Sequence, residues 1–124
     1  MSIHLERGKS EINGFGIFSK DKIVKGKKYY PAPLDLIYSH PQKNCARISE
    51  GKYLFDNKIL NWVNHSCNPN SKLEVNKDKV FLTAIKNIYP GKEITVNYNK
   101  TEPLGIKVKC TCKSKNCKGY FNKF

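Results

Sequence analysis

Three cysteines near the end of the chain constrain its fold more than any other feature. They stand in the run Cys110-Thr-Cys112-Lys-Ser-Lys-Asn-Cys117, which has the spacing C-x-C-x4-C. Thiolates this close together suit a tetrahedral zinc ion, and they leave one coordination position to be filled from elsewhere. The fourth ligand must come from Cys67, Cys45, a histidine or a water molecule. A catalytic zinc would keep the water, whereas four thiolates would make a closed structural site.

Other interpretations of the five cysteines are weaker. An odd number of cysteines, in a chain that starts without an apolar leader, argues against a disulfide framework. Three free cysteines in a basic tail are the remaining alternative, but clusters with this spacing are more typical of metal sites. A chain of 124 residues buries only about two-thirds of its extended surface on folding. A metal ion would therefore matter for the stability of so small a core.

The chain is strongly basic. Its 23 lysines and arginines and 10 acidic residues give a formal net charge of +13, and the only arginines are Arg7 and Arg47. Sites that read DNA bases favour arginine for its bidentate fork, so this composition argues against sequence-specific DNA readout. Non-specific contact with DNA or with another acidic surface stays open. No stretch approaches the roughly 18 apolar residues of a membrane helix, so we expect no membrane partner.

Short segments of alternating apolar residues predict a β-rich fold. We expect strands at Ile3–Glu6, Phe15–Phe18, Ser71–Val75, Val80–Ile85 and Glu93–Tyr98. The polar residues between Val75 and Val80 predict a hairpin turn. We also expect an extended stretch broken by prolines at Tyr29–Tyr38 and one helical turn at Ile59–Val63. A polar linker to the cysteine cluster is expected at Lys100–Lys109.

Four motifs follow one another along the chain, at Gly14–Phe18, Asn64–Asn70, Gly91–Tyr98 and Cys110–Tyr120. Taken singly, each has an ordinary structural explanation. A Gly-x-Gly pair marks any tight turn, an asparagine often caps a turn, a histidine is often a satisfied core residue, and a strand tyrosine often packs in the core. The Asn-His-Ser-Cys-x-Pro-Asn run is unusual, however, and the order and spacing of all four motifs carry more weight than any one.

Together these motifs resemble the SET-domain family of protein-lysine methyltransferases, with its cysteine-rich post-SET segment. The resemblance runs from Ile12 to Phe121. It implies a mainly β SET fold of several small curved sheets, a C-terminal pseudoknot and a zinc-stapled tail. The implied SET domain covers residues 1–100 and the post-SET zinc-binding segment residues 101–124. The resemblance also implies S-adenosylmethionine as cofactor, and a lysine side chain of a histone or another basic protein as acceptor.

The same resemblance implies roles for individual residues. Tyr98 is the expected catalytic residue, which orients the acceptor amine. The implied ligands of one structural zinc ion are Cys67, Cys110, Cys112 and Cys117. The implied cofactor-binding residues are Gly14, Phe15, Gly16, Asn64, His65, Tyr120 and Phe121. Cys45 is then left over and is expected to be a small buried apolar residue.

Some positions depart from the family pattern. Val96 stands two residues before Tyr98, where relatives often have Phe or Tyr, so the number of methyl groups transferred stays open. The second active-site tyrosine of some relatives has no clear counterpart, although Tyr29 and Tyr30 are near. The insert between Tyr38 and Ile59, where the family often builds its substrate groove, is short.

Two alternative functions follow from these departures and from the charge. The first alternative is a non-catalytic SET-like module that binds a peptide, and the second is a small basic zinc module that binds nucleic acid. We expect the protein inside the cell. It would be nuclear or chromatin-associated in a eukaryote, and cytoplasmic or exported to a host otherwise. The oligomeric state is left open.

Overall fold

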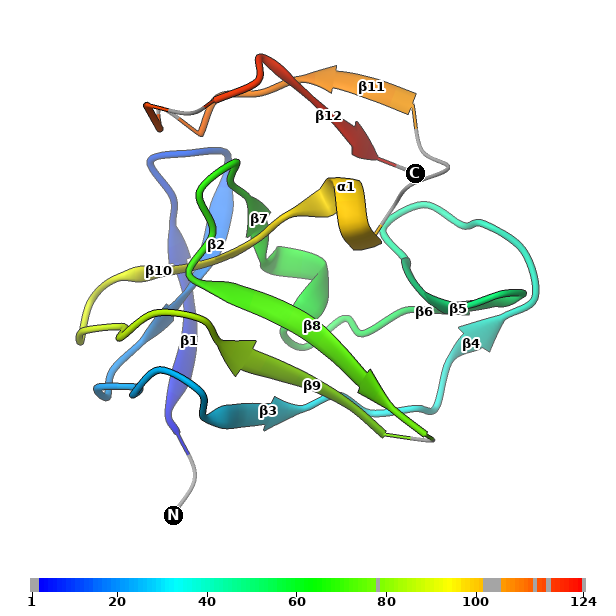
Figure 1. The fold of residues 1–124 in the computed structure, drawn as a ribbon, viewed down its shortest axis with the longest axis horizontal. Helices are drawn as coiled ribbons and strands as arrows, with labels where there is room; N and C mark the ends of the chain where they lie inside the picture. Colours follow the sequence, from blue (N-terminus) through cyan, green and yellow to red (C-terminus); the bar gives the residue numbers. More distant parts are fainter. Residues whose placement is uncertain (1–2, 78, 102–105, 113, 116, 124) are drawn as a thin grey trace.

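The computed structural model describes residues 3–77, 79–101, 106–112, 114–115 and 117–123. Strands make up most of its regular structure, which confirms the predicted β-rich fold (Figure 1). In chain order the strands are β1 (Leu5–Lys9), β2 (Phe15–Ser19), β3 (Lys28–Pro31), β4 (Ile37–Tyr38), β5 (Ala46–Ser49), β6 (Lys52–Leu54), β7 (Asn64–His65), β8 (Ser71–Asn76), β9 (Lys79–Ala84), β10 (Glu93–Val96), β11 (Ile106–Lys109) and β12 (Tyr120–Lys123). A 3-10 turn, η1 (Leu60–Trp62), and a short helix, α1 (Tyr98–Thr101), complete the described elements. Neither of these two helical segments has the length or apolar character to span a membrane.

Four small sheets organise the strands, in the orders β1-β2-β10-β7, β3-β9-β8, β4-β6-β5 and β11-β12. The core lies between the first two sheets, where Ile17 of β2, Ile94 of β10 and Leu82 of β9 are fully buried. Each such side chain stabilises the fold by about 1.5–3 kcal/mol relative to an exposed position. The small sheet β11-β12 lies at one end of the molecule, next to α1 (Figure 1).

The loop 66–70, between β7 and β8, runs along β10 and is hydrogen-bonded to it. The N–H of Ser66 donates to the carbonyl of Val96 at 3.0 Å. The side-chain amide of Asn70 donates to the carbonyl of Glu93 at 2.7 Å, and its oxygen accepts the N–H of Thr95 at 3.0 Å. Because β10 also pairs in parallel with β7, the chain that leaves β10 is held against the Asn64–Asn70 run. This arrangement agrees with the crossing that a pseudoknot requires.

Several predicted elements differ from the observed ones. The expected strand at Glu93–Tyr98 ends at Val96, and Tyr98 begins α1, because its backbone N–H donates to the side-chain ring of His65 and not to a backbone carbonyl of the neighbouring strand. The expected linker at Lys100–Lys109 contains β11, which pairs with β12; residues 102–105 of that linker lie outside the described residues. The extended stretch Tyr29–Tyr38 is present as β3 and β4.

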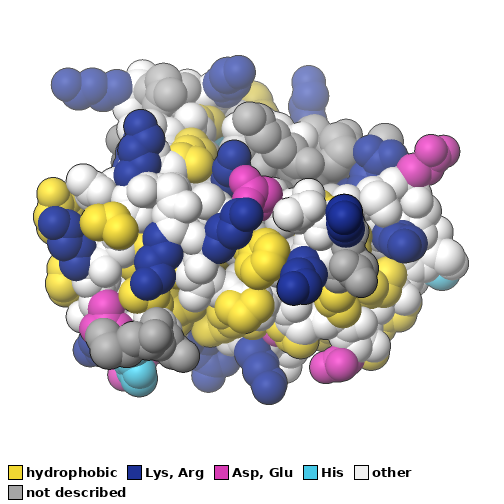
Figure 2. Space-filling view, turned by 60° about the horizontal axis from the view of Figure 1, so that its bottom comes forward, with side chains coloured by type: hydrophobic (Ala, Val, Ile, Leu, Met, Phe, Trp, Pro, Cys, Tyr) yellow, Lys and Arg dark blue, Asp and Glu magenta, His cyan; other side chains and the backbone are white. Residues whose placement is uncertain are grey.

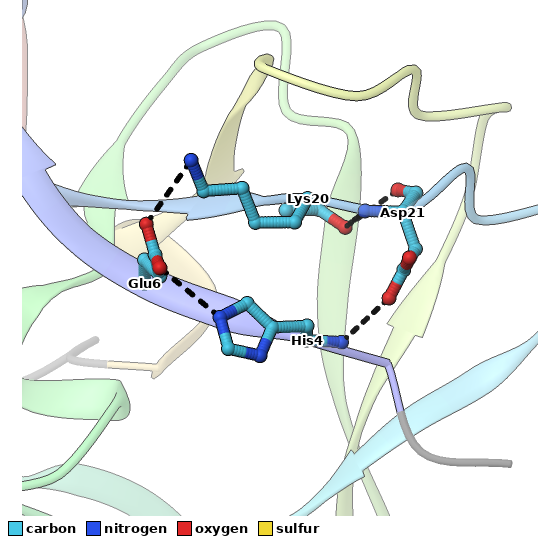
Figure 3. Close-up of polar contacts among 5 residues, drawn as sticks. His4, Glu6, Lys20 and Asp21 are labelled. Carbon is cyan, nitrogen blue, oxygen red and sulfur yellow. Dashed lines mark hydrogen bonds and ion pairs between the residues drawn. The ribbon is translucent and has the colours of Figure 1, made fainter.

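A polar network on the surface joins the start of β1 to the end of β2 (Figure 3). The backbone N–H of His4 donates to the carboxylate of Asp21 at 2.8 Å. The carboxylate of Glu6 contacts the His4 ring at 3.1 Å and the Lys20 ammonium at 3.2 Å, and these contacts lower the pKa of Glu6. Because exposed ion pairs contribute little free energy, this network helps to fix the strand register more than it stabilises the fold.

Candidate functional site

Four cysteine side chains meet between the loop 66–70 and the C-terminal segment. Their Sγ atoms all lie within 4.8 Å of one another, and the residues are Cys67, Cys110, Cys112 and Cys117. The Sγ atoms of Cys67 and Cys110 are 3.9 Å apart. Four sulfurs at zinc–sulfur distance around a tetrahedral ion would be about 3.8 Å apart. The donor set and its spacing therefore fit one metal ion, and Cys67 is the fourth cysteine of the group. Cys45 lies elsewhere and is only 2% exposed.

Protons must leave the cluster before it can bind a metal. Burial raises the pKa of Cys67 and of Cys110. Burial also acts to raise the pKa of Cys112, but hydrogen bonds from Ser114 and nearby groups outweigh it and lower that pKa to about 6. Since thiolates are the metal-binding form, occupation of the cluster by a divalent cation releases protons.

A pocket of about 190 Å³ opens beside the cysteine cluster. Its walls come from the loop before β2, from β7, from α1 and from the β11–β12 segment. The lining residues are Ile12, Asn13, Asn64, His65, Tyr98, Val108, Lys109, Thr111 and Phe121. Three predicted cofactor-binding residues and the predicted catalytic tyrosine thus share one pocket. We call it the cofactor-side pocket.

Four other predicted cofactor-binding residues, Gly14, Phe15, Gly16 and Tyr120, do not line this pocket. The Phe15 side chain is 55% exposed and packs edge to face against Trp62, with ring centroids 6.3 Å apart. Tyr120 is 59% exposed. Their role toward a cofactor stays a prediction.

Five lining residues went unrecognised in the sequence: Ile12, Asn13, Val108, Lys109 and Thr111. Ile12 and Asn13 directly precede Gly14, and Thr111 stands between two of the cysteines. The only indication in the sequence that these residues line the pocket is that they lie in or next to the motifs. Thr111 also fixes the two walls to each other, because its hydroxyl donates to the carbonyl of Ile12 at 2.9 Å.

The side-chain amide of Asn64 holds one wall of the cofactor-side pocket in place. Its Nδ2 lies 3.0–3.1 Å from Ser10 Oγ and from the carbonyl oxygens of Asn13 and Phe15. The same atom lies 2.8 Å from the carboxylate of Glu93. The Ser10 hydroxyl lies 2.7 and 2.9 Å from the two oxygens of that carboxylate. The network thus ties the loop before β2 to both β7 and β10.

The two glycines of the first motif answer different structural needs. Gly14 has a φ of +48°, a left-handed conformation that glycine adopts without strain. A Cβ atom at Gly16 would lie 2.3 Å from a carboxylate oxygen of Glu93. The absence of a side chain at Gly16 therefore leaves room for the carboxylate that anchors the pocket wall.

His65 connects the cysteine cluster to Tyr98 and to the C-terminal tail. The backbone N–H of Tyr98 donates to Nδ1 of His65 at 2.9 Å. Burial lowers the pKa of His65 to about 4, so the ring is neutral near pH 7. Because Nδ1 accepts the Tyr98 N–H, the proton of the neutral ring is on Nε2, which lies 3.5 Å from Cys67 Sγ. Phe121 stacks on the imidazole with centroids 4.5 Å apart and packs edge to face against Tyr98 at 5.4 Å. The position of the C-terminal tail and the position of Tyr98 therefore both depend on contacts with the His65 ring.

A second, narrower pocket of about 40 Å³ also reaches Tyr98. Most of its lining is apolar and includes Cys45, Leu54, Leu60, Val63, Leu73, Leu82 and Val96. Among the described residues, Tyr98 is the one that lines both pockets. Its hydroxyl donates to the carbonyl of Val63. Tyr98 thus stands between a larger pocket of mixed polar and apolar lining and a narrow, mostly apolar one, which we call the acceptor-side pocket.

Comparison with known proteins identifies the family. The model of the SET domain matches residues 14–99, well over half of the chain. This chain belongs to the SET-domain family. The match includes the first three motifs and Tyr98, and the cysteine cluster adds a tail that is consistent with a post-SET segment.

Curated relatives share low identity over most of this chain. A "Histone-lysine N-methyltransferase, H3 lysine-4 specific" of Cryptococcus neoformans is 24% identical over 146 residues, which cover 95% of this chain and 10% of that protein. A "Variant-silencing SET domain-containing protein" of Plasmodium falciparum is 29% identical over 141 residues, covering 94% of this chain and 6% of that protein. The chain therefore spans a tenth or less of the length of these relatives.

Solved structures share the fold. The crystal structure of KRYPTONITE in complex with mCHH DNA, H3(1-15) peptide and SAH aligns with a TM-score of 0.73 at 22% identity, over 97% of this chain and 30% of that one. The methyltransferase domain of human "Histone-lysine N-methyltransferase SETMAR" aligns with a TM-score of 0.71 at 18% identity, over 99% of this chain and 59% of that one. These alignments confirm the predicted SET fold.

Proposed function

We propose that this chain transfers methyl groups from S-adenosylmethionine to a lysine side chain of a protein. The observation that carries the proposal is the position of Tyr98 between two pockets. A reaction between two substrates requires each to be held and their reacting atoms to meet at one place. Relatives named as histone-lysine N-methyltransferases support this assignment.

S-adenosylmethionine would occupy the cofactor-side pocket and supply a methyl group bonded to a sulfonium. In such a transfer the lysine nitrogen would form the new N–C bond with its lone pair, the C–S electron pair would pass to sulfur, and the resulting ammonium would release a proton to water. The reactive amine is scarce in water, because the reference pKa of lysine is about 10.4. The apolar walls of the acceptor-side pocket, which include Val63 and Val96, favour the neutral amine. The Tyr98 oxygen and the Val63 carbonyl can accept N–H groups of that amine and aim its lone pair.

We propose that the metal of the cysteine cluster is a single structural zinc ion. Four thiolates suit zinc and leave no open position for a catalytic water. Zinc would hold the C-terminal segment close to β7, where Phe121 stacks on His65 and Val108 lines the cofactor-side pocket. The metal would thus complete the cofactor site without contacting the reacting atoms.

We propose a histone or another protein with an accessible lysine as the partner. The H3 peptide in the KRYPTONITE complex supports a histone segment as the occupant of the acceptor side. The net charge of +13 supports additional non-specific contact with DNA or an acidic surface. Incubation of the purified chain with labelled S-adenosylmethionine and core histones, alone and as nucleosomes, tests the activity. Absence of transfer to histones and to a broad protein array, with the cofactor bound, would contradict it.

Substitution of Gly16 by Ala is expected to weaken cofactor binding about tenfold. The added Cβ displaces the Glu93 carboxylate from Ser10 and Asn64, and each lost hydrogen bond costs about 0.5–1.5 kcal/mol. Calorimetric titration with S-adenosylhomocysteine measures the effect. Gly8→Ala is the matched control, because Gly8 pairs with Gly16 across the strands and its Cβ would meet only the Phe18 ring, at 3.3 Å. Equal affinity of both variants would refute the role of the Glu93 carboxylate.

A further inference from the structure

A groove of about 410 Å³ adjoins the acceptor-side pocket. Leu73 and Val96 line both spaces, so the groove lies directly against the pocket proposed to receive the acceptor amine. The groove is formed by β8, by the end of β10 and by Arg47 of β5. β5 is an edge strand of its sheet, and an edge strand offers unpaired backbone groups to an extended peptide. A protein segment lying in the groove could therefore place a lysine side chain in the acceptor-side pocket.

Arg47 lines this groove and carries an unsatisfied polar atom. Its Nε is buried and has no hydrogen-bond partner among the residues that the structure describes. None of the ion pairs in the described part of the chain includes Arg47. Burying a donor of a charged group without a partner costs free energy. Because the Arg47 side chain also lines the groove, a ligand with a carboxylate there would stabilise the guanidinium charge.

The other cation of the groove is different. The Lys72 ammonium lies 3.3 Å from the Glu74 carboxylate, and the Lys72 side chain is 54% exposed. No acidic residue is among the described residues that line the groove. Of the two cations that line the groove, Arg47 is therefore the one without a described carboxylate in ion-pair contact.

We propose that this groove binds the segment of the acceptor protein that flanks the target lysine, and that Arg47 selects an acidic residue, Asp or Glu, in that segment. The inference rests on the proposed function, because it takes the occupant of the groove to be the methyl acceptor. A guanidinium suits this task, since its planar fork binds a carboxylate through two parallel hydrogen bonds.

The charge of the whole molecule agrees with this choice. Lys and Arg side chains are spread among apolar side chains over the face in Figure 2, where Asp and Glu side chains stand at few places. With a net charge of +13, the protein repels a uniformly basic segment at long range and attracts one that carries acidic residues. The acidic residue and the target lysine can then be held by neighbouring parts of one surface.

Peptide binding tests the proposal without requiring turnover. Fluorescent decapeptides with one central lysine carry a single Glu, or Gln in its place, at each position from three before to three after the lysine. Fluorescence anisotropy with S-adenosylhomocysteine present measures their affinity. For at least one position, the Glu peptide is expected to bind about tenfold more tightly than its Gln partner, a difference of about 1.4 kcal/mol. The preference is expected to weaken as salt concentration rises.

Two variants assign the preference to one side chain. Arg47→Gln is expected to abolish the difference between Glu and Gln peptides, whereas Lys72→Gln is expected to keep it. Circular dichroism melting curves check that each variant is folded, and a third variant, Arg47→Lys, keeps the charge at this position but loses the fork. Equal binding of Glu and Gln peptides by the unaltered protein, or an unchanged preference in Arg47→Gln, overturns the inference. If the preference is present and no peptide is methylated, the proposed function fails while the assignment of Arg47 to an acidic ligand stands.

Discussion

Tyr98→Phe is expected to slow methyl transfer by roughly 10²-fold or more while leaving cofactor affinity nearly unchanged. The substitution removes the hydroxyl that donates to the Val63 carbonyl and stands between the two pockets. A misplaced amine loses the near-attack geometry on which the rate depends, and small displacements cost factors of this size. The ring itself stays in place, because its contacts with His65 and Phe121 do not involve the hydroxyl.

Single-turnover methylation of a histone substrate, combined with calorimetric titration of S-adenosylhomocysteine, separates rate from binding. Tyr89→Phe is the matched control, since the Tyr89 side chain is exposed and lines neither pocket. It is expected to retain the full rate. A Tyr98→Phe protein that transfers methyl groups as fast as the unaltered protein would remove Tyr98 from the active centre. The proposed activity would then need another residue between the two pockets.

The parts of the fold that could be predicted are those in which local pattern decides the structure. The hairpin of β8 and β9 follows from two alternating segments and a polar turn, and both strands lie where they were expected. β11 was missed although the sequence Ile-Lys-Val-Lys alternates, because its polar surroundings were interpreted as a linker. Its partner is β12, which lies beyond the cysteine cluster. Pairing over such a distance depends on the fold of the whole tail and is invisible in a local pattern.

The candidate site shows the same division between local and long-range information. The cluster of four cysteines follows from motif spacing and resemblance, and the structure brings all four together. The first motif was assigned to the cofactor, yet Gly16 faces the carboxylate of Glu93, a residue far along the chain. Lys109 and Thr111 line the cofactor-side pocket because the tail folds back over β7. The sequence contains these residues, but only the tertiary fold brings them to the pocket.

Cys67→Ser is expected to remove the metal and to weaken cofactor binding by at least about tenfold, while the two main sheets remain folded. Cys67 supplies the one cysteine of the cluster outside the C-terminal run, so its loss would break the proposed link through the metal from the loop 66–70 to the tail. Structural zinc sites contribute about 10–16 kcal/mol of binding free energy in small domains, which is far more than the contacts of one aromatic ring can replace. Without the metal, the tail is no longer fixed to the loop 66–70, and Val108 and Phe121 of the tail lose their positions in the wall of the cofactor-side pocket. The core around Ile17 and Leu82 does not include the cluster and should persist.

Metal analysis by mass spectrometry, circular dichroism and calorimetric titration of S-adenosylhomocysteine together check this expectation. The unaltered protein should contain one zinc ion per chain, and Cys112→Ser should lose it as Cys67→Ser does. Cys45→Ala is the matched control, because Cys45 is buried in the acceptor-side pocket and lies outside the cluster; it should keep its zinc. Full zinc content in Cys67→Ser would show that another group completes the site. Loss of zinc with unchanged cofactor affinity would instead show that the tail holds its place through the His65–Phe121 stack and the β11–β12 pairing alone.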